Sequence, residues 1–111
     1  MTIERTLSGR ESRHSLPHGI IDTQNHVYAP GFMAMDGGPG LPKGMPDITQ
    51  YKKLCEWLGI NKTVITVANA YQRDNECLLH ALNQFGPLAR GVAAISPKIP
   101  EKDLARLMSK G

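Results

Sequence analysis

The sequence predicts an α/β fold with a parallel sheet. Three segments rich in apolar and β-branched residues, 19–22, 62–68 and 90–95, alternate with segments in which apolar residues recur at helical spacing. Strands that alternate with helices in this way pair in parallel through right-handed crossovers. The chain has 111 residues, of which 41% are hydrophobic and 21% charged, and this is the size and composition of one globular domain.

The first strand lies between two irregular segments. Residues 1–17 are polar and without periodicity, and we interpret them as a flexible leader that precedes one domain at residues 18–111. The strand itself is Gly19–Asp22. The loop Thr23–Pro46, rich in Gly and Pro, follows it. Connections this long in compact domains are usually functional or disordered. We therefore expect residues 37–44 to lie over a binding site.

The first helix has a clear beginning and end. Asp47 is a suitable N-cap, and Gly59 is a suitable residue just beyond the last turn. Between them, apolar residues recur on one face: Ile48, Tyr51, Cys55 and Leu58. The β-rich segment Lys62–Ala68 is predicted to be the second strand, and residues 69–75 a polar loop.

The remaining elements repeat this alternation. Asp74 or Asn75 is predicted to cap a second helix, which Gly86 and Pro87 end. Its buried face is expected to hold Leu78, Leu82 and Phe85. Arg90–Ile95 is the third predicted strand. The last helix is expected to face inward with Leu104, Leu107 and Met108.

Charge and cysteine content exclude several classes of protein. The 13 Lys and Arg exceed the 10 Asp and Glu by only three, and the two signs are interleaved along the chain, so we expect no nucleic-acid partner. There is no run of about 18 apolar residues, so we expect no membrane partner. Cys55 and Cys77 fall inside predicted helices and are interpreted as reduced packing residues, which favours a cytoplasmic location.

Polar side chains gather where the first two strands end. Asp22, Gln24 and His26 are two residues apart, a spacing that places them on one face of an extended segment. Asn69 directly follows the second strand, and Arg73 comes four residues later. Ligands of α/β proteins bind at the carboxyl ends of parallel strands. We expect Gln24, His26, Asn69 and Arg73 to bind a substrate, with Asp22 in a supporting role.

Four segments carry a resemblance to a known family. They are residues 19–28, 37–42, 57–60 and 69–75, and their order and spacing resemble the N-terminal part of amidohydrolase-superfamily enzymes that isomerise or hydrolyse lactones. The resemblance covers residues 19 to about 110. It implies three βα units of a parallel (β/α)8 TIM-barrel-type fold, an incomplete barrel, and a lactone or sugar-acid substrate.

One departure from the family pattern bears on metal binding. Amidohydrolases usually carry two histidines one residue apart after the first strand, and these bind a divalent metal; here Gln24 stands at the first position and only His26 remains. One imidazole and one amide make a poor zinc site. The resemblance implies chemistry without metal or another cofactor, and a general base on a later strand, beyond Gly111.

Two interpretations of a three-strand chain remain open. It is the N-terminal fragment of a lactone-processing barrel enzyme, and then the isolated chain is expected to be inactive. Alternatively, it is a non-catalytic α/β module that associates with itself through exposed sheet edges.

Overall fold

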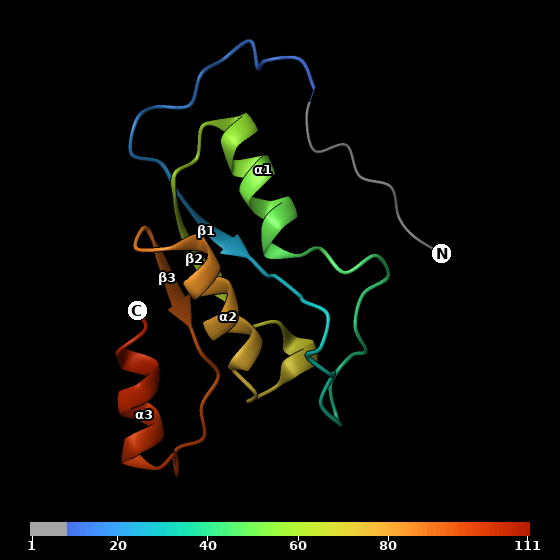
Figure 1. The fold of residues 1–111 in the computed structure, drawn as a ribbon, viewed down its shortest axis with the longest axis vertical. Coiled ribbons are helices and arrows are strands. Elements are labelled where there is room, and N and C mark those ends of the chain that lie inside the picture. The colour runs from blue at the N-terminus through green and yellow to red at the C-terminus, as the bar shows by residue number, and fades with distance from the viewer. Residues whose placement is uncertain (1–8) are drawn as a thin grey trace.

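The computed structural model describes residues 9–111, which form a three-stranded parallel sheet with helices between the strands (Figure 1). The strands are β1 (Ile21–Asn25), β2 (Lys62–Thr66) and β3 (Ala89–Val92), in the order β1-β2-β3. Both strand pairs are parallel. The predicted α/β class and the parallel alternation of strands and helices are therefore confirmed.

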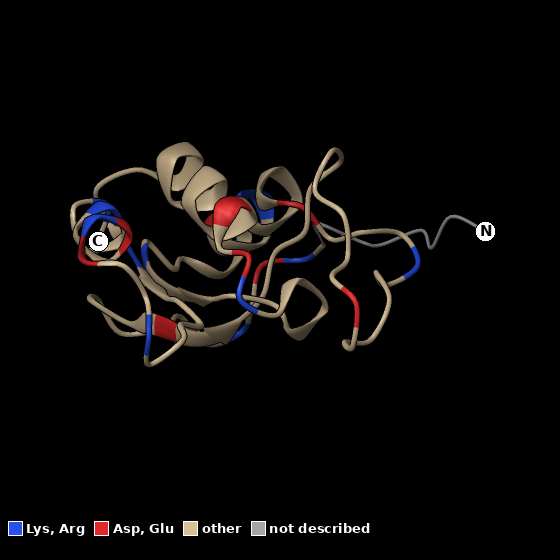
Figure 2. Cartoon of the chain, turned by 90° about the horizontal axis from the view of Figure 1, so that it is seen from below, with Lys and Arg blue, Asp and Glu red and all other residues tan. Residues whose placement is uncertain are grey.

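The helices gather on one side of the sheet (Figure 2). They are α1 (Ile48–Leu58), α2 (Glu76–Phe85) and α3 (Glu101–Met108), and a short 3₁₀ helix, η1 (Asn69–Tyr71), follows β2. None of the helices in the described part of the chain is long and apolar enough to cross a membrane. The sheet and one layer of helices make a thin molecule whose extents are 48 × 36 × 18 Å.

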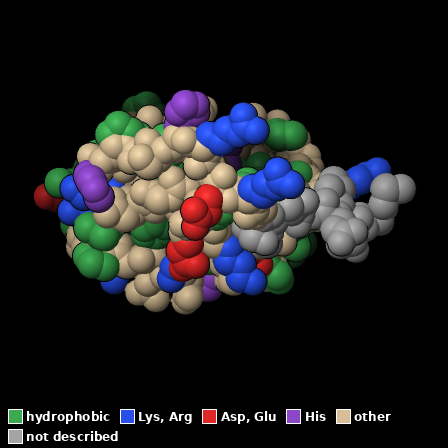
Figure 3. All heavy atoms as spheres, turned by 90° about the horizontal axis from the view of Figure 1, so that it is seen from above, with side chains coloured by type: hydrophobic (Ala, Val, Ile, Leu, Met, Phe, Trp, Pro, Cys, Tyr) green, Lys and Arg blue, Asp and Glu red, His purple; other side chains and the backbone are tan. Residues whose placement is uncertain are grey.

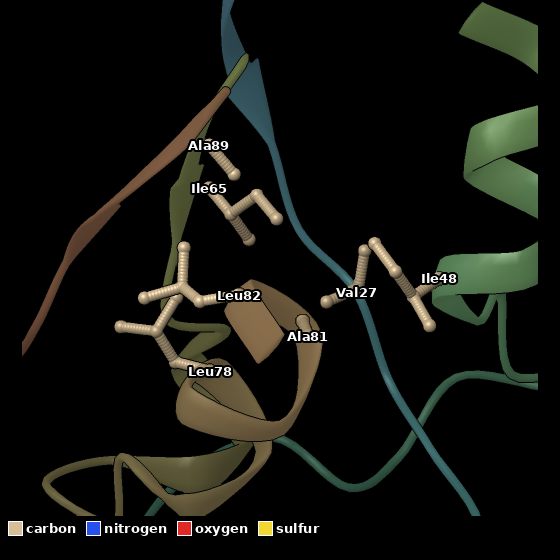
Figure 4. Close-up of a cluster of buried hydrophobic side chains, with 7 residues drawn as sticks. All are labelled: Val27, Ile48, Ile65, Leu78, Ala81, Leu82 and Ala89. Carbon is tan, nitrogen blue, oxygen red and sulfur yellow. The ribbon is translucent and has the colours of Figure 1, made fainter. Parts of the chain in front are cut away.

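The core lies between the sheet and the first two helices (Figure 4). It is a cluster of seven buried residues: Val27, Ile48, Ile65, Leu78, Ala81, Leu82 and Ala89. Gly91 of β3 permits the close approach of α2, because a Cβ at this position would lie 2.9 Å from Leu82 Cδ1. The core thus fixes β2 and β3 against α2, and Ile48 anchors the start of α1.

The predicted ends of α1 are confirmed. The Asp47 carboxylate accepts a hydrogen bond from the Gln50 backbone N–H at 2.9 Å, and Gly59 adopts a left-handed conformation with φ 76°. Only glycine adopts this conformation without steric cost. Cys55 and Cys77 are both buried free thiols.

The strand bounds differ from the predicted ones. β1 begins at Ile21, because Gly19 has φ 84° and belongs to a turn, and it runs on to Asn25. The other two strands end at Thr66 and Val92, earlier than their β-rich sequences suggest. A strand ends where its neighbour no longer pairs with it, and β propensity alone carries no information about that neighbour.

The last helix is less buried than predicted. Leu104 and Leu107 are half-buried, but Met108 is 73% exposed, so the expectation that all three face inward is wrong for Met108. An ion pair attaches α3 to α2, since Arg106 donates to both oxygens of Glu76 at 2.6 and 2.9 Å. Beyond the helix, the Gly111 carbonyl accepts a hydrogen bond from Gly91 N–H on the outer edge of β3.

The predicted leader is only partly visible. Residues 1–8 lie outside the described residues, and residues 9–17 form no helix or strand. The Trp57 indole N–H of α1 donates to the Arg10 carbonyl at 3.2 Å.

On the end of the molecule that Figure 3 shows, Lys and Arg side chains are interspersed with Asp and Glu and form no continuous patch of one charge.

Candidate functional site

A bulge in β1 decides which side chains reach the candidate site. Asp22 pairs with Thr63 of β2 and Asn25 pairs with Ile65, so three steps along β1 match two steps along β2. Thr63 and Ile65 are almost fully buried beneath the helices, and Asp22 and Asn25 therefore face the helix layer with them. The expectation that Asp22, Gln24 and His26 share one face is wrong, because the extra residue breaks the alternation.

The Asp22 carboxylate is engaged on the helix side of the sheet. Its Oδ1 accepts a hydrogen bond from the Gln24 backbone N–H at 3.0 Å, and its Oδ2 accepts one from the Tyr51 hydroxyl of α1 at 2.6 Å. The Thr63 hydroxyl lies 2.9 Å from the same Tyr51 oxygen. Asp22 thus connects the bulge to α1 and does not touch the His26 ring in these contacts.

His26 points the other way and is exposed. Its Nδ1 lies 3.0 Å from the Thr66 carbonyl oxygen. A carbonyl can only accept, so this contact requires a proton on Nδ1, and in the neutral ring Nε2 is then an acceptor. The β1 backbone and the end of β2 together set the orientation of the imidazole.

His26 and Asn69 line the same hollow, at the end toward which the strands point. Its volume is about 260 Å³, and β2, β3 and the segments that follow them supply the other walls. Figure 2 views the molecule from this end. The carboxyl ends of the three strands therefore bring together an imidazole and an amide, groups that bind carbonyl, hydroxyl or carboxylate oxygens.

Gln72 also lines this hollow, and the sequence analysis missed it. Its Nε2 donates to the Asn69 carbonyl at 2.7 Å and to Asn69 Oδ1 at 3.1 Å. Its backbone has φ 49°, which is uncommon for a residue other than glycine and concentrates at functional sites. Gln72 lies in the segment 69–75 that carries the family resemblance, but its role depends on the 3₁₀ turn in a segment that was predicted as a polar loop.

Part of the glycine-rich loop contacts the same turn, η1. A Cβ at Gly38 would lie 2.6 Å from Gln72 Nε2 and 2.8 Å from the Asn69 carbonyl, and the Met35 N–H donates to the Ala70 carbonyl at 2.8 Å. Residues 35–38 therefore pack against η1, next to the hollow.

The structure separates Arg73 from His26 and Asn69. Arg73 lines a different hollow of about 430 Å³, between the start of α2 and the start of α3, together with Lys98 and Asp103. The two hollows adjoin at Ala94, which lines both. Gln24 is exposed but is not part of the wall around His26.

Of the two predicted caps of α2, Asp74 or Asn75, the structure favours Asp74. Asp74 caps the first turn of α2 by accepting from the Glu76 N–H at 3.0 Å, whereas the Asn75 side chain makes no cap bond. Asn75 is buried and exchanges two hydrogen bonds with the Ala94 backbone, at 2.9 and 3.0 Å. It thereby fixes the segment after β3 that separates the two hollows.

The described residues offer few side chains that could bind a metal ion. Across residues 9–111, no group of three His, Cys, Asp or Glu side chains lies close enough together to hold a metal ion. At the candidate site itself the side chains are one imidazole and neutral amides. Zinc sites normally supply three or four N, O or S⁻ ligands, so these residues do not fit such a site.

Comparisons with known proteins identify relatives that are longer than this chain. No family model matches. D-galactarolactone isomerase of Agrobacterium fabrum is 43% identical over 108 residues, which are 96% of this chain and 37% of that protein. A 2-pyrone-4,6-dicarboxylate hydrolase of Comamonas testosteroni is 31% identical over 101 residues, 86% of this chain and 32% of that protein. The chain thus spans about a third of each curated relative.

Two solved structures resemble this one. A crystal structure of an Agrobacterium tumefaciens protein without ligand superposes with a TM-score of 0.88 at 42% identity, over 96% of this chain and 38% of that one. A probable 2-pyrone-4,6-dicarboxylic acid hydrolase of Acinetobacter baumannii, with citric acid bound, has a TM-score of 0.75 at 18% identity. It covers 82% of this chain and 34% of its own, and the likeness is one of fold.

Proposed function

We propose that the chain forms the first three βα units of a (β/α)8 barrel enzyme. The chain is homologous to the N-terminal part of D-galactarolactone isomerase and, more distantly, of 2-pyrone-4,6-dicarboxylate hydrolase, in the amidohydrolase-related group. The proposed enzyme isomerises or hydrolyses a sugar-acid or dicarboxylic lactone in the cytoplasm. One observation carries the proposal: the 43% identity extends over 96% of the chain, including the strand ends that form the hollow around His26.

In this proposal the chain supplies groups that bind the substrate. The Asn69 amide donates hydrogen bonds to lactone oxygens, and His26 Nε2 accepts from a substrate hydroxyl. Gln24, which lies outside the wall of the hollow, contacts only a ligand that extends beyond it. Donors aimed at the carbonyl stabilise the negative charge that develops on its oxygen when the lactone is attacked. Arg73 reaches a ligand only where the ligand extends past Ala94 into the adjoining hollow, where its guanidinium would pair with a carboxylate.

The general base of the proposed reaction is not assigned to this chain. Asp22 is the carboxylate nearest in sequence to the strand-end groups, but both of its oxygens accept hydrogen bonds on the helix side of the sheet. A base must lie within hydrogen-bond reach of the proton that it removes. We therefore assign Asp22 to structural support, and the base to residues outside these 111.

Binding and turnover are tested separately. The intact chain is titrated with D-galactarolactone while backbone amide signals around the hollow, among them those of Thr66 and Ala93, are followed by NMR. The wild-type protein is expected to show saturable shifts that His26→Ala and Asn69→Ala weaken. The chain alone is expected to give no detectable turnover. Saturable binding that both variants leave unchanged would place the ligand elsewhere and contradict the proposed site.

A chimera tests the proposed activity. This chain replaces the matched N-terminal part of the Agrobacterium isomerase, and the chimera is expected to isomerise the lactone in the presence of a strong chelator. Loss of a general acid or base commonly costs 10²–10⁴-fold or so in rate, whereas loss of one binding group costs less, so His26→Ala should reduce rather than abolish turnover. A soluble, folded chimera without activity, or activity that chelation removes, would contradict the proposal.

A further inference from the structure

We propose that Tyr51, on α1, is a positioning residue of the candidate site, which acts through Asp22 to hold the β1 bulge and so turn His26 toward the hollow. The functional meaning of this inference rests on the proposed function. The structural part, a link between a helix residue and the direction of a strand residue, stands on the contacts alone. Tyr51 is not among the residues that line the hollow.

The bulge is necessary for the direction of His26. In a regular strand, residues an even number apart point to the same side, so His26 would share the side of Asp22 and face the helices. The extra residue between Asp22 and Asn25 reverses this parity. As a result His26 is exposed and Val27 is buried in the core. Without the bulge, the imidazole would face the helix layer and Val27 would turn out of the core.

Polar side chains hold the bulge where the regular backbone pairing between β1 and β2 is interrupted. Asp22 Oδ1 accepts from the Gln24 backbone N–H, at the residue where the pairing with β2 is interrupted. On the far side, the Asn25 amide donates to Thr63 Oγ1 at 2.8 Å and to the Val64 carbonyl at 3.2 Å. Because the Asp22 carboxylate bonds to the backbone of the bulge itself, the position of this carboxylate is coupled to the backbone geometry of the bulge.

Tyr51 fixes that carboxylate from the helix layer. Its hydroxyl donates to Asp22 Oδ2 at 2.6 Å, and its ring lies 6.1 Å, centroid to centroid, from the ring of Phe85 on α2. Burial, and secondarily the hydrogen bond to Asp22, raises the pKa of Tyr51 well above its ordinary value. The hydroxyl therefore keeps the proton that it donates at neutral pH.

The primary test uses Tyr51→Phe, which removes one hydroxyl and keeps the ring. Tyr28→Phe is the matched control, because Tyr28 is also half-buried but its ring lies against Tyr71 of η1 and not against Asp22. We measure hydrogen exchange of the Gln24 amide and the ¹⁵N shifts of the His26 ring in the full chain. In Tyr51→Phe, exchange at Gln24 is expected to rise by about tenfold or more, and the ring signals to move toward mixed tautomers. The control should leave both unchanged.

A second variant separates positioning from a loss of stability. Asp22→Asn leaves an acceptor for Gln24 but removes the charge on which Tyr51 acts, and the double variant is expected to be no worse than either single one, because both act on one contact. Amides of β2 and β3 serve as the reference for global stability. Additive effects, or effects confined to those reference amides, would overturn the proposal.

The two hypotheses fail in different ways. If wild-type protein binds no lactone but Tyr51→Phe still alters Gln24 and His26 as described, the positioning role stands and the proposed function falls. If lactone binds to the wild-type protein and Tyr51→Phe leaves His26 unchanged, the positioning role is wrong and the proposed function survives.

Discussion

Two glycines of the long loop, Gly38 and Gly40, occupy different surroundings although only one residue separates them. A Cβ at Gly38 would lie within 2.8 Å of both Gln72 Nε2 and the Asn69 carbonyl, whereas nothing lies within 4 Å of a Cβ at Gly40. Gly38→Ala is expected to destabilise the protein by about 1–3 kcal/mol through overpacking, and Gly40→Ala to have little effect. Urea unfolding measures both. Equal midpoints would show that the loop does not rest on η1.

The two cysteines are expected to be unreactive in the folded protein. Burial raises the pKa of both the Cys55 and the Cys77 thiol, so each remains protonated at pH values where an exposed thiol is partly ionised. Because the thiolate is the nucleophile, a disulfide reagent should label neither residue at about pH 8 until denaturant is added. Fast labelling of one cysteine in native buffer would show that its helix opens locally.

At the residue scale, the sequence predicts which side chains end the strands but not where they point. His26 and Asn69 line one hollow, whereas Arg73 lines another and Asp22 faces the helices. The partner of the Asp22 carboxylate there is Tyr51, which lies 29 residues away in the chain. Period-two alternation is a local rule, and a bulge that distant contacts hold cannot be found by applying it.

At the element scale, one ion pair joins the exposed helix α3 to α2. The hydrogen bond from Arg106, and secondarily its charge, lowers the pKa of Glu76 below its ordinary value. A lowered folded-state pKa stabilises the protein above the pKa of the unfolded chain, and this stabilisation is lost as the pH falls through the folded-state pKa. Both side chains are about half exposed, so the effect is small and screened by salt.

This pair predicts a specific pH dependence. Arg106→Gln is expected to lower the midpoint of urea unfolding near pH 6. The difference from wild type should shrink as the pH falls through the lowered pKa of Glu76 and vanish once the carboxyl group is protonated in both the folded and the unfolded chain. Lys102→Gln, on the same helix, is the control and should behave as wild type apart from its net charge. A difference that persists in acid would assign the effect of Arg106 to packing.

Helices were easier to predict than strands, for a physical reason. Asp47 and Gly59 mark the ends of α1 through contacts within a few residues, and these end signals are local in sequence. Strand ends depend on partners elsewhere: β3 stops at Val92, although Ala93, Ala94 and Ile95 have similar apolar character. The 3₁₀ turn at Asn69 was missed because Tyr71, which it buries, reads as an ordinary loop residue in a polar segment.

At the scale of the whole molecule, apolar surface remains uncovered around β3. Leu88 is 49% exposed, Val92 48% and Ile95 45%. Apolar side chains from α2, from α3 and from the segment after β3, among them Leu82, Leu107 and Ile95, line a hollow of about 220 Å³. Apolar patches of this kind next to an unpaired strand edge favour association with another chain. The same surface would be covered in the proposed barrel.

This surface leads to a prediction that relates the two interpretations of the chain. The 111-residue protein is expected to associate as its concentration rises, and Val92→Lys should shift that association to higher concentration, because a charge on the sheet must be desolvated when another chain covers it. Met33→Lys is the matched control: Met33 is 80% exposed but lies in the long loop between β1 and α1 and not in β3. Light scattering over a concentration series measures both variants. Specific association should stop at one discrete oligomer size, as a self-assembling module requires. Non-specific association through the exposed apolar surface should continue to larger sizes as the concentration rises. In that second case, extending the chain with the later strands of the Agrobacterium relative should abolish the association. A wild-type protein that stays monomeric at every concentration would show that the β3 surface does not drive association at all.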